Sequence, residues 1–107
     1  MSMYVDLLSK ALQARSEEHN ADEWLDLALE YRDRMLGSRL QRGESSGSVL
    51  ADDVAYDRAL IRLCAAKGIG AAPERFAQPV DERRRLEQEL AAMDLDLSAL
   101  GRIRRRI

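Results

Sequence analysis

The stretch from Val49 to Gly68 constrains the fold most, because it is the longest apolar-rich segment with both a start and a stop signal for a helix. Ser48 can cap its first turn, and glycine is the residue type that most often ends a helix. At 100° per residue its apolar side chains fill one continuous half of a helical wheel. The members of this half are Leu50, Val54, Tyr56, Leu60, Ile61, Leu63 and Cys64. The segment is therefore predicted to be a core helix over about 49–67.

Asp57 lies inside this apolar half of the predicted helix. A carboxylate in such a place needs a buried partner, or its pKa rises until the group is neutral. One interpretation is an ion pair with an arginine of the preceding helix, such as Arg32. The other is a general acid or base in a pocket. We favour the ion pair, because no second carboxylate, serine or histidine stands at a spacing that would complete a mechanism. Asp57 is nevertheless the single catalytic candidate.

Three further helices are predicted, over about 3–16, 21–36 and 79–100. The second begins with a capping box formed by Asn20 and Glu23. It is expected to stop at Gly37, although residues 38–42 could prolong it by about a turn. The polar, glycine-containing segment 42–48 is interpreted as a mobile connection. Pro73 is expected to begin one short extra turn. The fold class is therefore all-α: a small four-helix bundle-like domain over 1–101, followed by a basic tail over 102–107.

The predicted last helix carries apolar residues at alternating steps of four and three, as in the seam of a packed or coiled-coil helix. These residues are Leu86, Leu90, Met93, Leu97 and Leu100. The polar segment near Asp94 could interrupt the helix. Since four apolar faces are many for so short a chain, Leu97 and Leu100 are candidates for contact with a partner.

Composition narrows the class of protein. A chain of 107 residues suits one domain with a modest core, and no apolar run approaches the ~20 residues of a membrane span. Cys64 is the only cysteine, so no internal disulfide can form, which predicts a reducing cytoplasm. Among the 17 basic residues 15 are arginine, whose codons are GC-rich, and this predicts a bacterial source.

Charge is divided unevenly along the chain. Residues 1–57 carry a net charge of −6, whereas residues 58–107 carry +4. The basic candidates for partner binding are Arg83, Arg84, Arg85, Arg102, Arg104, Arg105 and Arg106. Such a cluster could neutralise phosphates of nucleic acid. We favour a solvated helix end, because no aromatic residues are interleaved and Glu87 and Glu89 lie one turn after Arg83 and Arg85.

No motif in the sequence carries a reaction. His19, the only histidine, does not supply the three or four ligands of a metal site, and neither a cofactor nor a small molecule is indicated. The leading hypothesis is a small non-enzymatic interaction or regulatory protein that binds a protein partner or itself through its helical faces. The alternative is a nucleic-acid-binding protein that uses the arginine-rich C-terminal region. The third is an enzyme that uses Asp57 as acid or base.

Overall fold

The computed structural model describes residues 2–14, 19–40 and 46–105; at 38–40, 46–49 and 103–105 it describes the backbone alone. Every regular element of these residues is helical, which confirms the predicted all-α class. The elements are α1 (Met3–Gln13), α2 (Ala21–Leu40), α3 (Ser46–Ala66), the 3-10 turn η1 (Pro73–Ala77), α4 (Pro79–Ala92) and α5 (Leu97–Arg105).

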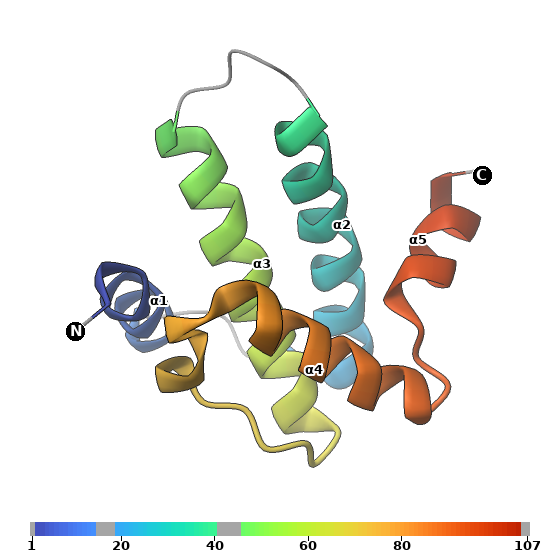
Figure 1. Ribbon diagram of the computed structural model, residues 1–107. Helices are drawn as coiled ribbons and strands as arrows, with labels where there is room; N and C mark the ends of the chain where they lie inside the picture. Colours follow the sequence, from blue (N-terminus) through green and yellow to red (C-terminus); the bar gives the residue numbers. More distant parts are fainter. Residues whose placement is uncertain (1, 15–18, 41–45, 106–107) are drawn as a thin grey trace.

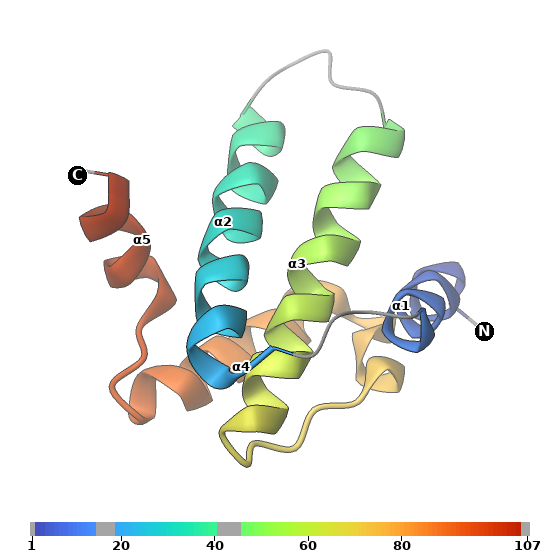
Figure 2. The same ribbon diagram turned by 180° about the vertical axis from the view of Figure 1, so that it is seen from behind.

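An antiparallel pair of long helices, α2 and α3, forms the centre of the fold (Figure 1). Helix α4 crosses this pair, while α1 lies beside α3 and α5 lies beside α2, as the view from behind also shows (Figure 2). Most of the apolar half of α3 faces the core as predicted, since Tyr56, Leu60, Leu63 and Cys64 are fully buried. Leu50, which was predicted to belong to this half, is 37% exposed near the start of the helix. Phe76 of η1 closes the core where α1 and α4 meet this turn.

The helix ends follow from local hydrogen bonds. Both bonds of the predicted capping box form, since the Glu23 N–H donates to Asn20 Oδ1 (2.9 Å) and the Asn20 N–H donates to Glu23 Oε1 (3.0 Å). At the end of α3, Gly68 adopts a φ of +78°. This conformation lets the Ile69 N–H reach the Cys64 carbonyl at 2.8 Å, the Schellman arrangement that closes a helix.

The prediction of one continuous helix over 79–100 was wrong, because the chain breaks between α4 and α5. Asp94 adopts a φ of +65°, the conformation usually reserved for glycine, and the Leu95 N–H bonds back to the Leu90 carbonyl at 2.9 Å. The predicted seam is therefore discontinuous, with Met93 48% exposed. Asp96 then accepts a bond from the Ala99 N–H (3.2 Å) and begins α5.

Other helix bounds also differ from the predicted ones. α1 ends at Gln13 instead of residue 16, and α2 runs through Gly37 to Leu40, since one glycine costs a helix only about 1 kcal/mol. α3 begins at Ser46, so the predicted mobile connection is helical from there, while residues 41–45 lie outside the described residues. Residues 102–105, expected in a tail, continue α5.

Candidate functional site: the groove between α2, α4 and α5

Asp57 is fully buried, and its partner comes from α4 rather than from α2. The Arg83 guanidinium donates two hydrogen bonds to this carboxylate, from Nε to Oδ1 at 2.6 Å and from one terminal nitrogen to Oδ2 at 2.8 Å. This is the paired geometry that makes arginine–carboxylate contacts strong. The Tyr4 hydroxyl of α1 also donates to Asp57. The ion pair expected with Arg32 was thus wrong in its partner, although the expectation of a buried carboxylate was right.

Burial decides what Asp57 can do. Desolvation raises the pKa of its carboxyl above the ordinary value, against the opposing attraction of Arg83 and the hydrogen bond from Tyr4. The carboxylate has no surface open to solvent, and its two oxygens are occupied by Arg83 and Tyr4. A general acid or base must reach its substrate. The cluster therefore acts as a polar link that joins α1, α3 and α4.

Arg32 contributes to a second polar link, on the α2 side of α4. Its guanidinium donates to Glu87 at 3.4 and 3.5 Å and to the Ser98 hydroxyl at 3.0 Å. The Tyr56 hydroxyl donates to the same Glu87 carboxylate. The predicted pairing of Arg83 with Glu87 was consequently wrong, because Glu87 is held by α2 and α3 while Arg83 turns toward Asp57.

The three consecutive arginines of α4 have separate environments. Arg83 is 7% exposed and committed to Asp57. Arg85 pairs with Glu89 at 2.6 Å as predicted, and also with Glu82 at 2.7 Å. Arg84 is exposed and makes no ion pair or side-chain hydrogen bond with any residue that the structure describes. The stretch Arg83–Arg85 therefore presents one uncompensated cation to a partner, not three.

The remaining candidates within the described residues lie on α5. Leu97 is 1% exposed and Leu100 is half-buried, so both face the body of the protein to differing degrees. Arg102 is exposed. Arg104 and Arg105 belong to α5 but their side chains are outside the described residues, as is the whole of Arg106.

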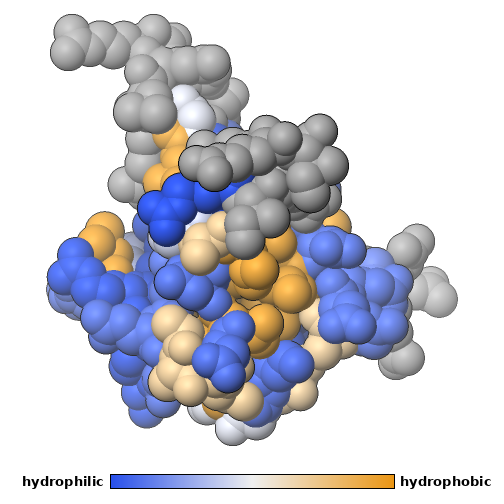
Figure 3. All heavy atoms as spheres, turned by 90° about the vertical axis from the view of Figure 1, so that its right-hand side faces the viewer, coloured by the Kyte–Doolittle hydropathy of each residue, from blue (hydrophilic) through white to orange (hydrophobic). Residues whose placement is uncertain are grey.

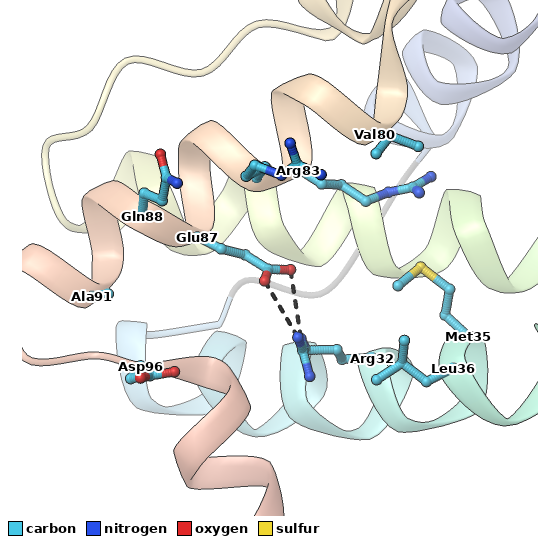
Figure 4. A pocket seen from close by; sticks show the side chains of 10 residues that line it. Arg32, Met35, Leu36, Val80, Arg83, Glu87, Gln88, Ala91 and Asp96 are labelled. Carbon is cyan, nitrogen blue, oxygen red and sulfur yellow. Dashed lines mark hydrogen bonds and ion pairs between the residues drawn. The ribbon is translucent and has the colours of Figure 1, made fainter.

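A groove of about 490 Å³ runs between α2 and α4 and reaches the start of α5. Figure 4 shows its layout: Met35, Leu36 and Val80 gather at one end, and the Arg32–Glu87 pair bridges the middle. Ala91, Gln88 and Asp96 lie toward the other end, and Arg84 also lines the groove. Val80 is 54% exposed and Leu36 half-buried, so apolar surface remains open to solvent.

The neighbouring face of the molecule has a similar character. Figure 3 looks onto the side where α5 lies and shows apolar side chains gathered in its middle, with hydrophilic side chains around them. Apolar surface bordered by polar groups is typical of sites that bind another molecule. The groove and this face together make the side of α2, α4 and α5 the best candidate for a binding surface.

The sequence alone did not reveal the groove. Val80, Arg84, Gln88 and Ala91 recur at steps of three or four along α4, so they share one face of that helix. This face mixes apolar, charged and amide side chains and gives no periodic hydrophobic signal. Its role emerges only when α2 is placed opposite, and that placement was not predictable from the spacing.

Among the described residues, the cysteine and the histidine show no arrangement that points to a reaction or to a metal site. Burial raises the pKa of the Cys64 thiol to about 12, which keeps it protonated and unreactive. The His19 ring packs edge-on against Trp24, with ring centroids 4.8 Å apart. Within residues 2–14, 19–40 and 46–105, no three histidine, cysteine or acidic side chains gather as metal ligands would. None of the helices described has the length and apolar character needed to span a membrane.

With the geometry established, we compared the chain with known proteins. No family model, no curated protein and no solved structure matched it. The argument for function therefore depends on the groove and its surroundings.

Proposed function

We propose that this protein is a small, non-catalytic interaction module that binds a protein partner in the groove between α2, α4 and α5. The observation that carries the proposal is the contrast between the groove and the buried polar groups. Asp57, Arg83, Glu87 and Arg32 are all occupied in joining helices, whereas Val80 stays more than half exposed beside the other apolar residues at one end of the groove. Buried and paired charges hold the scaffold, and accessible apolar surface supplies binding energy.

The shape of the groove supports a helical partner. Its walls are two helices, and its apolar residues gather at one end of an open groove rather than in an enclosed cavity. An amphipathic helix laid into such a groove buries its apolar face while its polar face stays in water. We also propose a bacterial, cytoplasmic setting, which the arginine-rich composition and the single, buried cysteine support.

The proposal is tested by affinity capture from a lysate of the source organism, with nuclease treatment, using the full chain and two variants. Val80→Asn removes the exposed apolar side chain of the groove, and it spares α4 because valine and asparagine have similar helix propensities. Met3→Asn is the matched control, since Met3 is 78% exposed on α1, away from the groove.

We expect one protein to be retained after nuclease treatment by the wild type and by Met3→Asn. Its recovery should fall about tenfold with Val80→Asn, the typical effect of losing one apolar anchor. Equal recovery by Val80→Asn would contradict the proposal. A set of proteins that disappears with nuclease would favour the nucleic-acid alternative. A doubled mass of the purified chain in light scattering, abolished by Val80→Asn, would identify the partner as a second copy.

A further inference from the structure

The charged groups that line the groove differ in whether their charge is already compensated. Arg32 and Glu87 neutralise each other across the groove, and Arg83 is neutralised by Asp57 beneath it. Asp96 accepts the Ala99 N–H at the start of α5, where the helix end favours a negative charge. Arg84 remains: among the described residues it has no acidic partner, although it lines the same groove. Among the described residues that line the groove, Arg84 is therefore the cation that has no acidic partner.

The position of this charge relative to the apolar end is set by α4 itself. Arg84 follows Val80 by four residues, so the two side chains lie on one face of the helix, separated by a rise of about 6 Å. A helix lying along α4 repeats this spacing. It would present an apolar side chain to Val80 and Leu36 and, three or four residues away, the group that meets Arg84.

From this geometry we infer that the occupant of the groove is an amphipathic helix of a protein partner that carries an aspartate or glutamate three or four residues from its apolar anchor, placed to pair with Arg84. The inference rests on the proposed function and specifies the chemistry of its partner. The apolar end of the groove supplies affinity, and the Arg84–carboxylate pair sets register and selects acidic partners over basic ones.

A nucleic acid fits this surface less well. On α4, Arg84 is the one cation without an acidic partner among the described residues, because Arg83 and Arg85 are engaged with Asp57, Glu82 and Glu89. The apolar residues at the end of the groove offer nothing to a phosphate backbone, and binding through phosphates needs several cations in a row.

The test is a selection of randomised 14-residue helical peptides, displayed and panned against the full chain and, in parallel, against Arg84→Glu. Arg84 is exposed, so the substitution leaves packing unchanged; circular dichroism checks the fold, and Arg84→Gln serves as a second, uncharged variant. Arg75→Glu is the matched control, because Arg75 is also exposed but lies in η1, outside the groove.

We expect the peptides enriched on the wild type to carry an acidic residue three or four positions from an apolar anchor. Their affinity should fall about tenfold with Arg84→Glu and stay unchanged with Arg75→Glu. Replacing the acidic residue of the peptide by lysine should restore binding to Arg84→Glu. Panning on that variant should itself enrich basic residues at the same position.

The outcomes separate the inference from the proposed function. Peptides that lose affinity with Val80→Asn but are indifferent to Arg84 would overturn the acidic partner and leave the groove as a binding site. Peptides that bind Val80→Asn as well as the wild type, or the absence of any enriched helical peptide, would overturn both.

Discussion

Removing the guanidinium of Arg83 should destabilise the protein more than any other single change to its polar groups. In Arg83→Met the Asp57 carboxylate, which is 0% exposed, would keep only the Tyr4 hydroxyl as a partner. Leaving one member of a buried ion pair uncompensated costs about 3–5 kcal/mol. A domain of this size has a free energy of unfolding of about 5–15 kcal/mol, so the loss is a large fraction of it.

Substituting Asp57, the other member of the ion pair, should lower the free energy of unfolding less, and this difference makes the prediction specific. In Asp57→Asn the cation of Arg83 still has Asp53 within 3.7 Å, so it is not left without a carboxylate. The double variant Arg83→Met/Asp57→Asn should recover much of the loss, because the fully buried carboxylate that Arg83 compensates is removed as well. The matched control is Arg34→Met, whose pair with Glu30 lies at the surface and should contribute less than about 1 kcal/mol.

Urea unfolding, followed by circular dichroism and by Trp24 fluorescence, measures these differences. We expect the loss in the free energy of unfolding to increase in the order Arg34→Met, Asp57→Asn, Arg83→Met, with the melting temperature of Arg83→Met lowered by at least about 12 °C. A cost for Arg83→Met below that of Arg34→Met would refute the reasoning. So would additivity in the double variant, because it would show that the two side chains are not coupled.

Three other properties follow from the same packing. Burial and neighbouring carboxylates raise the pKa values of Tyr4 and Tyr56, so above a pH of about 10 only the unfolded state loses these protons. The free energy of unfolding should therefore be constant in this respect below that pH and fall above it by about 1.4 kcal/mol per pH unit for each tyrosine. Tyr4→Phe should remove one of the two contributions in alkaline unfolding curves. Alkylation of Cys64 by iodoacetamide at pH 8 should follow global unfolding, and rapid labelling of the native protein would contradict its burial. Arg62 donates to the Leu12 carbonyl at 2.7 Å. Arg62→Ala should therefore lower the free energy of unfolding by about 1 kcal/mol and speed amide hydrogen exchange in α1. Unchanged exchange in α1 would show that this bond does not hold the helix end.

The helical class was predictable because it depends on local signals. Most of the apolar half of α3 and the Asn20–Glu23 capping box are encoded within a few residues of sequence and appear in the structure as predicted, whereas Leu50 is exposed. The break after α4 was predicted only as a possible interruption near Asp94, because Asp94 takes a conformation that glycine normally supplies. The sequence there lacks the glycine that usually marks the end of a helix.

Long-range pairing was the part that sequence reasoning could not supply. Asp57 was correctly expected in the core, but Arg32 and Arg83 are both arginines on neighbouring helices, and only the crossing of α4 over α3 decides between them. The groove has the same origin, because Leu36 and Val80 lie 44 positions apart in the chain and share a surface only after α2 and α4 have packed.

The most direct test of the central claim is a map of backbone amide chemical shifts of the ¹⁵N-labelled full chain, recorded with and without the best-binding selected peptide. The account predicts that shifts concentrate at Leu36, Val80, Arg84 and Ala91, with little change along α1. Val80→Asn should weaken the whole set of shifts, and Met3→Asn should leave it unchanged. Shifts centred on α1, or spread evenly over the molecule, would contradict the assignment of the groove as the binding surface.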